Sequence, residues 1–314
     1  MIAVVAGVLR DEAGRILLAQ RLPGKHLAGT WEFPGGKCET GESPHEALAR
    51  ELTEELGITI DDSRPLLSLT HHYPEKTVRL LLREVQGWQG QPQGCEGQPL
   101  RWVAVADMSE LPMPAADRPI VRTLGLDARY AITPDPARVG GVDGLVAAWQ
   151  TMLDAGFRLL QLRAHSLSAK VLAGLAPRLG EMARTRGARW LLNGPSEMAL
   201  AAGADGLHLR HDELIRLKGR PVPDHLLLAA SCHDRESLDQ AAALGADFVC
   251  LSPVRETSSH AQARPLGWDG FARLCQHSGL PVLALGGIKP DDLGVAREHG
   301  AWGVAGISAF GGAA

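Results

Sequence analysis

The sequence predicts an α/β protein built from two units, the second of which closes into a barrel. The chain has 314 residues, of which 45% are hydrophobic and 22% are charged, and this is the balance of a globular protein long enough for two cores. After Leu126 the character of the sequence changes, because short apolar runs begin to alternate with amphipathic stretches. We therefore expect one domain over residues 1–126 and a second over residues 128–314.

Two apolar runs at the N-terminus predict a β-hairpin. Residues 2–9 and 15–20 flank the segment Asp11-Glu-Ala-Gly14, whose Asp and Gly suit a tight reversal. Residues 77–84 form a further extended region. The first run is too short for a membrane span and has no basic segment before it, so it does not read as a signal peptide. We expect it to be the first strand.

One strong helix is predicted over residues 44–56. Ser43 can cap its first turn, Pro44 fits the first helical position, and Glu46 completes a Ser-x-x-Glu capping box. Gly57 can adopt the left-handed conformation that ends a helix. Both ends of this helix are therefore defined by the sequence.

A second helix is expected at residues 118–124, and eight short apolar runs follow Leu126. They are residues 130–133, 157–163, 190–193, 206–209, 226–231, 248–252, 282–286 and 303–307. Helical stretches intervene, for example at residues 168–186, 235–244 and 290–299. Strand–helix alternation of this kind predicts a parallel sheet, and eight repeats predict closure into a (β/α)8 barrel, the TIM barrel.

Charge and cysteine content narrow the classes of partner. The formal net charge of −4 provides no whole-chain basic field for holding a nucleic acid polymer, so free nucleotides are the better fit. The five cysteines are scattered and lack the CxxC spacing of a zinc site. We expect reduced thiols, a cytoplasmic protein and no membrane association; the sequence does not indicate an oligomeric state.

The most specific pattern is G-x5-E-x7-R-E-U-x-E-E-x-G-U, where U is a bulky apolar residue; it is the Nudix box. Its members are Gly36, Glu42, Arg50, Glu51, Leu52, Glu54, Glu55, Gly57 and Ile58. Positions three and four apart share one helical face, which brings the three Glu side chains from 51 to 55 together. Such like charges destabilise a helix by roughly 0.2 to 0.5 kcal/mol per pair unless a hard cation neutralises them. The alternative is a solvated face on which Glu46 pairs with Arg50.

Magnesium is the expected cation, with Mn²⁺ as an alternative, because Mg²⁺ takes a few carboxylates together with phosphate oxygens. The cation would offset phosphate charge and lower the pKa of bound water, and a carboxylate would take the proton during attack on phosphorus. The expected products are a monophosphate and either pyrophosphate or phosphate.

Residues 1 to about 126 resemble the MutT-type 8-oxo-dGTP diphosphatases of the Nudix family. The resemblance runs through Trp31-Glu-Phe-Pro-Gly-Gly-Lys37, Gly94-Cys-Glu-Gly-Gln-Pro99, and Pro114-Ala115 with the nearby Asp and Pro. It implies an α/β/α sandwich with a mixed sheet. It also implies a set of metal-binding groups, namely Glu51, Glu54, Glu55, Glu96 and the carbonyl of Gly35, with Arg50 as a further catalytic residue. Either Glu51 or Glu96 would be the base.

The same resemblance implies where substrate binds. Arg21, His26 and Lys37 fall where that family contacts phosphate. The family reads the oxidised guanine with an Asn near the late Pro-Ala, whereas this chain has Ala116 and Asp117 there. An Asp can still accept hydrogen bonds from the N1–H and amino group of guanine. The aromatic pair Trp31 and Phe33 either fills the core or lines the base pocket, with the core as the first expectation.

Residues 128 to about 310 resemble the thiamine phosphate synthase and TenI-like barrels. The matching stretches are Gln161-Leu-Arg163, Leu191-Leu-Asn193, Gly203-Ala-Asp-Gly-Leu-His-Leu209, Gly245-Ala-Asp-Phe-Val249 and Ala284-Leu-Gly-Gly-Ile288. Such barrels often hold phosphate beyond strands seven and eight. Here those ends carry Gly286, Gly287, Gly306 and Ser308, which we expect to bind a thiamine-type phosphate.

Several synthase positions are replaced. Asn193-Gly194 stands in place of Asn-Asp, His165 in place of a lysine, and Thr257-Ser-Ser-His260 in place of Thr-x-Thr-Lys. The histidine of TenI-type tautomerases is replaced by Pro253. The loss of two cations and a carboxylate should weaken binding of a magnesium pyrophosphate, so we expect the barrel to be a degenerate domain.

The sequence suggests three functions, which we give in order of preference. The first is hydrolysis of 8-oxo-dGTP or a related purine nucleoside triphosphate, which would keep the nucleotide pool free of mutagenic precursors and so serve DNA repair. The second is hydrolysis of thiamine-pathway pyrophosphates, with the barrel binding the products. In the third, the barrel is a non-catalytic sensor that binds a phosphate ligand and modulates the first domain.

Overall fold

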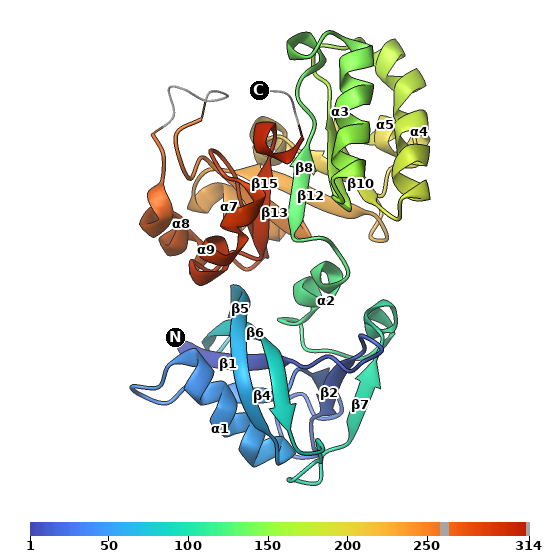
Figure 1. Cartoon of the computed structure of the whole chain (residues 1–314). Coiled ribbons are helices and arrows are strands. Elements are labelled where there is room, and N and C mark those ends of the chain that lie inside the picture. Colours follow the sequence, from blue (N-terminus) through green and yellow to red (C-terminus); the bar gives the residue numbers. More distant parts are fainter. Residues whose placement is uncertain (258–263, 312–314) are drawn as a thin grey trace. The chain divides into compact units, whose positions relative to one another are not determined.

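The chain folds into two compact units, Met1–Gly125 and Leu126–Ala314 (Figure 1). The structure is a computed structural model that describes residues 1–257 and 264–311. Ser258, Ser259 and His260 of the predicted pyrophosphate loop lie outside the described residues. Within the described residues, every helix is too short or too polar to cross a membrane.

The first unit contains two sheets. Its elements are β1 (Ile2–Val8), β2 (Ile16–Gln20), β3 (Trp31–Glu32), β4 (Gly35–Lys37), α1 (Pro44–Leu56), β5 (Thr59–His72), β6 (Thr77–Gln89), β7 (Leu100–Val103), η1 (Val105–Glu110) and α2 (Arg118–Leu124). The larger sheet has the order β4-β1-β6-β5; β1 is parallel to β6, and the other pairs are antiparallel. The smaller sheet, β3-β2-β7, is antiparallel. The predicted mixed sheet is therefore confirmed.

The predicted hairpin of the first two strands is wrong in its pairing. The reversal itself is present, because the Gly14 N–H donates to the Asp11 carbonyl and the Asp11 side chain accepts from the backbone of Arg15. An antiparallel bridge between Arg10 and Ile16 and the bond from the Leu17 N–H to the Leu9 carbonyl continue this reversal, after which the two strands separate into different sheets. Strand β1 pairs instead with β4 and β6, so both of its edges are occupied by segments from later in the chain.

Helix α1 begins and ends where the sequence predicts. The Ser43 hydroxyl accepts from the Glu46 N–H, and the Glu46 carboxylate accepts from the Ser43 N–H. Gly57 ends the helix with φ of 66°. The apolar face packs into the core of the unit through buried residues Ala47, Leu48, Leu52 and Leu56. The acidic residues therefore lie away from this buried face.

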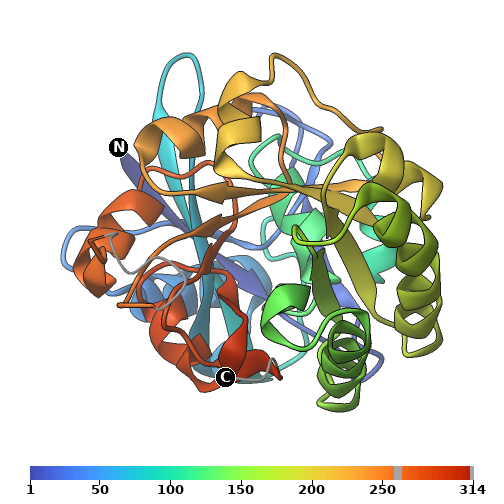
Figure 2. The same ribbon diagram turned by 90° about the horizontal axis from the view of Figure 1, so that it is seen from above.

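The second unit is a closed barrel of eight parallel strands, as predicted. The strands are β8 (Arg129–Ile132), β9 (Leu159–Arg163), β10 (Arg189–Asn193), β11 (Gly206–Leu209), β12 (Leu227–Cys232), β13 (Phe248–Leu251), β14 (Val282–Ala284) and β15 (Gly303–Gly306). The helices are η2 (Pro136–Arg138), α3 (Val142–Asp154), α4 (Ala169–Thr185), α5 (Ser196–Ala201), α6 (His211–Arg216), α7 (Arg235–Ala243), α8 (Gly267–Cys275), η4 (Pro290–Asp292), α9 (Leu293–Glu298) and η5 (Ser308–Phe310). Figure 2 shows these helices around the outside of the strands. The polar residues at the carboxyl ends of the strands thus meet at one mouth of the barrel.

Candidate functional site

Helix α1 presents its acids to the strand that precedes it. Gly36 in β4 lies against the end of the Glu51 side chain, and a Cβ at Gly36 would sit 2.3 Å from the Glu51 carboxylate. The N–H of Gly35 donates to the Glu55 carboxylate at 3.2 Å. Gly35 has φ of 146°, and a Cβ there would lie 2.3 Å from the carbonyl oxygen of Val5. Glycine at position 36 therefore allows the backbone to approach the Glu51 carboxylate closely, and glycine at position 35 allows β4 to lie close to β1.

Arg50 holds one end of this acidic cluster. Its guanidinium pairs with Glu42 at 2.8 Å and with Glu51 at 2.9 Å, and it also donates to the Lys37 carbonyl at 3.0 Å. The hydrogen bond from Arg50, followed by one from the Glu39 N–H, lowers the pKa of Glu42 to about 2. A weaker pair at 3.5 Å reaches Glu54, whose side chain is largely exposed. Arg50 thus joins the helix to β4 and contacts both Glu51 and Glu54.

The turn that carries Glu96 is tied to the end of the same helix. The carbonyl of Glu55 accepts from the Cys95 N–H at 3.0 Å and from the Gln98 side chain at 2.8 Å. Gln98 also accepts from the Glu96 N–H at 2.9 Å. The carboxylate of Glu96 pairs with Lys25, which sequence reasoning did not identify.

The pKa of Glu55 is shifted by its burial and by the negative charges around its carboxyl. Burial raises the pKa of its carboxyl to about 7, and the bond from the Gly35 N–H acts in the opposite direction. The like charges of Glu51, Glu32 and Glu96 raise it further. Three of these four acids are predicted metal ligands. The three acids that act on Glu55 come from three separate segments of the chain, namely α1, β3 and the turn that carries Glu96.

This donor set fits a hard divalent cation. Carboxylate oxygens that repel one another, beside a backbone without Cβ atoms, are the groups that Mg²⁺ prefers. Among residues 1–257 and 264–311, no three Asp, Glu, His or Cys side chains already converge as a complete cation site. The side chains instead pair with Arg50, Lys25 and the Gly35 N–H. A cation held there would be bound by Glu51, Glu54, Glu55 and Glu96 with the Gly35 carbonyl.

The predicted substrate residues divide into two groups. Arg21 pairs with Glu32 at 2.7 Å, and these two charges both act on the carboxyl of Asp117. Asp117 is only 6% exposed, and burial, followed by the charge of Glu32, raises its pKa to about 7 while Arg21 acts in the opposite direction. Lys37 is not part of this group; it is exposed at the end of β4, beside Arg50.

Two residues that the sequence did not single out, Tyr73 and Glu32, interact electrostatically with Asp117. Burial raises the pKa of Tyr73, to which the charge of Asp117 also contributes. The ring of His26 lies edge-on to the Tyr73 ring, with centroids 6.1 Å apart. Glu32 is the second residue; as a lone acid between Trp31 and Phe33, it could have been noticed in the sequence. Phe33 is buried core and Trp31 is half-buried.

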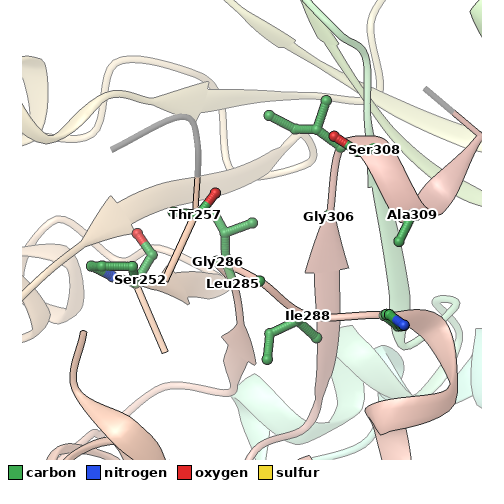
Figure 3. A pocket seen from close by; sticks show the side chains of 12 residues that line it. Ser252, Thr257, Leu285, Gly286, Ile288, Gly306, Ser308 and Ala309 are labelled. Carbon is green, nitrogen blue, oxygen red and sulfur yellow. The ribbon is translucent and has the colours of Figure 1, made fainter. Parts of the chain in front are cut away.

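The four predicted phosphate residues of the barrel line one cavity of about 250 Å³ (Figure 3). Gly286 has φ of 95°, and a Cβ there would lie 2.8 Å from Pro253. The cavity wall includes Gly287, Gly306 and Ser308, with Lys289 beside them. Glycine is thus required for the turn after β14, whatever the cavity binds.

A second cavity of about 240 Å³ shares Ser252, Leu285 and Ile307 with the first. It is lined by His165, which stands in place of the synthase lysine, and by Asn193, which precedes the replaced position Gly194. Its wall also contains three histidines that the sequence did not single out, at positions 208, 211 and 233. Burial lowers the pKa of His208 to about 3, so this ring is neutral at physiological pH.

Comparison with known proteins gives a separate result for each unit. Residues 5–123 match the family model described as NUDIX domain, and residues 129–310 match the model described as thiamine monophosphate synthase. The 8-oxo-dGTP diphosphatase of Escherichia coli is 36% identical over 121 residues, which are 38% of this chain and 94% of that protein. The putative thiamine-phosphate synthase of Geobacter sulfurreducens is 40% identical over 183 residues, 58% of this chain and 85% of that protein. The solved thiamine phosphate pyrophosphorylase from Pyrococcus furiosus is 25% identical, with a TM-score of 0.49, and covers 59% of this chain and 88% of its own.

Proposed function

The chain belongs to the NUDIX family through residues 5–123 and to the thiamine monophosphate synthase family through residues 129–310, and from this premise we propose that it is a magnesium-dependent hydrolase of 8-oxo-dGTP or a related purine nucleoside triphosphate. We assign the reaction to a domain over residues 1–126 and treat residues 128–314 as its partner domain. The activity would clear an oxidised nucleotide from the cytoplasmic pool before it enters DNA.

One observation carries the proposal: Glu51 and Glu55 contact the glycine pair of β4, and the charge of Glu96 also acts on Glu55. The Gly36 backbone meets the end of Glu51, the Gly35 N–H meets Glu55, and Glu96 is near enough for its charge to raise the pKa of Glu55. Acids crowded in this way disfavour one another unless positive charge is supplied. A nucleoside triphosphate bound with its cation brings that charge together with phosphate oxygens.

The chain's own residues supply proton transfer and orientation. Glu51 or Glu96 accepts the proton of the attacking water while the bond between the phosphorus and its leaving phosphate oxygen breaks. Arg50 holds Glu51 through its 2.9 Å ion pair, so it acts as a positioning residue. Magnesium, when bound, would neutralise phosphate charge and lower the pKa of water.

Asp117 supports a purine base in the proposed substrate. Its carboxyl is buried beside Glu32 and Arg21, where an ionised Asp can accept from the N1–H and amino group of guanine. A buried acceptor that gains donors is favoured over one left unpaired by roughly 1–3 kcal/mol. This difference would favour guanine over a base without those donors.

The test measures turnover of the purified full-length protein on 8-oxo-dGTP and on dGTP, each with Mg²⁺. We expect the ratio kcat/KM to be higher for 8-oxo-dGTP. The variant Glu51→Gln, prepared in the same way, controls for contaminating phosphatases. Equal kcat/KM for the two nucleotides would contradict the proposed selectivity. If neither nucleotide were hydrolysed, the proposed activity would be wrong.

A second candidate is hydrolysis of thiamine-pathway pyrophosphates, with the barrel holding a product. The observation that favours it is the barrel cavity, in which Gly286, Gly287, Gly306 and Ser308 lie together. We propose that this cavity binds a phosphate monoester even where the barrel does no chemistry. Calorimetry of the full chain with thiamine phosphate tests the binding, and incubation of thiamine diphosphate with Mg²⁺ tests the hydrolysis. No released phosphate in the second assay would exclude this candidate.

A further inference from the structure

Lys25 lies in a loop that fixes its backbone beside the acidic cluster. The loop connects β2 to β3, and the Lys25 N–H donates to the Leu22 carbonyl at 3.2 Å. The loop is closed by a bond of 2.9 Å from the Gly29 N–H to the Arg21 carbonyl. Leu27 adopts φ of 60°, a left-handed conformation that makes the turn tight. The position of the Lys25 backbone is therefore set by the loop.

The ammonium of Lys25 reaches acids from two other segments. It pairs directly with the carboxylate of Glu96, 71 residues away in the sequence. That hydrogen bond is the main reason why the pKa of Lys25 is raised, and the charge of Glu55 adds to it. Both paired side chains are about half exposed, at 51% for Lys25 and 47% for Glu96. The pair is thus open to solvent and to an incoming ligand.

Two arginines near the site have fixed partners. Arg21 pairs with Glu32, and Arg50 is held by Glu42 and Glu51 through several bonds. Lys25 differs because its compact charge is carried on a flexible four-carbon stem. The Lys25 ammonium can therefore exchange a Glu96 oxygen for another anionic oxygen without disrupting further ion pairs.

We propose that Lys25 is a substrate-positioning residue that gives up Glu96 to the divalent cation and pairs with a phosphate of the nucleoside triphosphate. The inference rests on the proposed function. A cation and the ammonium would compete for the same Glu96 oxygens, and a polyphosphate arriving with its cation offers Lys25 new anionic partners. Lys25 therefore couples cation binding at Glu96 to phosphate binding.

The experiment compares Lys25→Met and Lys25→Arg with the unchanged full chain, and uses Lys170→Met, an exposed lysine of α4, as the matched control. Calorimetric titration with Mn²⁺ in the absence of nucleotide measures the first effect. We expect Lys25→Met to bind Mn²⁺ roughly three- to tenfold more tightly, because the competing ion pair is lost. We expect Lys170→Met to bind Mn²⁺ as the unchanged chain does.

Steady-state kinetics on 8-oxo-dGTP measures the second effect. Loss of one charged phosphate contact should raise KM roughly tenfold in Lys25→Met with a smaller change in kcat. In Lys25→Arg, which keeps the charge, KM should return most of the way to the value of the unchanged chain. A general loss of structure would instead weaken Mn²⁺ binding and nucleotide binding together. Lys25→Met with unchanged Mn²⁺ affinity and unchanged KM would overturn the inference. If the unchanged chain hydrolyses no nucleoside triphosphate, the proposed function fails, and the Mn²⁺ titration alone then decides whether Lys25 competes for Glu96.

Discussion

Replacing Asp117 with Asn tests the electrostatics of the base pocket. Asp117 precedes α2 and is 6% exposed, and its pKa is raised to about 7 by burial and by the charge of Glu32, against the effect of Arg21. The ordinary value is 3.8, so ionised Asp117 disfavours the folded state. Because the pKa is raised, its contribution to stability is fully present below pH 3.8 and is lost as pH rises through about 7.

The magnitude follows from the difference between these two pKa values. A difference of about three units at roughly 1.4 kcal/mol per unit gives an upper limit of about 4 kcal/mol at pH 8. Asp117→Asn keeps the shape of the side chain and removes the charge. We therefore expect the variant to be more stable than the unchanged chain at pH 8, by about 1 to 4 kcal/mol, with the advantage shrinking toward pH 4.

Urea unfolding of the full chain at pH 8, 6 and 4, followed by the signal of the first unit, provides the measurement. Asp107→Asn, at an exposed position in η1, is the matched control and should show no such dependence on pH. If the difference in unfolding free energy between Asp117→Asn and the unchanged chain is constant across these pH values, the raised pKa is wrong. The same variant should also change the ratio of kcat/KM for 8-oxo-dGTP and dGTP, because the residue that faces the base has lost an acceptor and gained a donor.

Three further predictions concern single positions. Glu51→Gln should keep the fold but lower kcat by roughly 10²-fold or more, as measured by phosphate release, and near-normal turnover would rule out its assigned role. Gly36→Ala should push the Glu51 carboxylate away from β4, because its Cβ would lie 2.3 Å from that group; we expect weaker Mn²⁺ binding in calorimetry with little change in melting temperature. Gly286→Ala introduces a Cβ 2.8 Å from Pro253 at φ of 95°, so it should lower the melting temperature of the barrel and weaken its binding of phosphate, whereas Gly174→Ala, in open space on α4, should do neither.

The parts of the fold that were predicted correctly are those with local causes. Helix α1 has a capping box at one end and a left-handed glycine at the other, and both depend on neighbouring residues. The barrel strands are buried on both sides, so they appear in the sequence as short apolar runs. Their ends differ by one to two residues, as at Gly286, which leaves the strand for a left-handed turn.

Strand β5 was missed because its sequence does not alternate. The stretch Thr59–His72 contains Pro65 and two adjacent acids, and its pairing with β6 shifts register at three places. Each β-bulge adds a residue and so reverses the side-chain pattern that follows it. The pairing partners of β1 were also beyond local reasoning, since β4 and β6 lie far along the chain.

The candidate site also has one part that local sequence spacing predicts and one part that it does not. Spacing along one helix is what predicts that Glu51, Glu54 and Glu55 lie together, because a helix turns a sequence interval into a distance. The pairing of Lys25 with Glu96 joins residues 71 positions apart, and no sequence interval encodes that contact.

The two carboxyls with a pKa near 7, those of Glu55 and Asp117, mark the two ends of the proposed nucleotide site. Ionisation of either carboxyl is unfavourable because each is buried beside other acids, and the charge of Glu32 raises the pKa of both. A cation near Glu55 and a base with N–H donors near Asp117 would relieve the two costs separately. A guanine nucleoside triphosphate with its metal supplies both in one molecule, whereas the aminopyrimidine of thiamine diphosphate has an amino group but no ring N–H beside it. The electrostatics of the first unit therefore favour the nucleotide over the thiamine-pathway substrate.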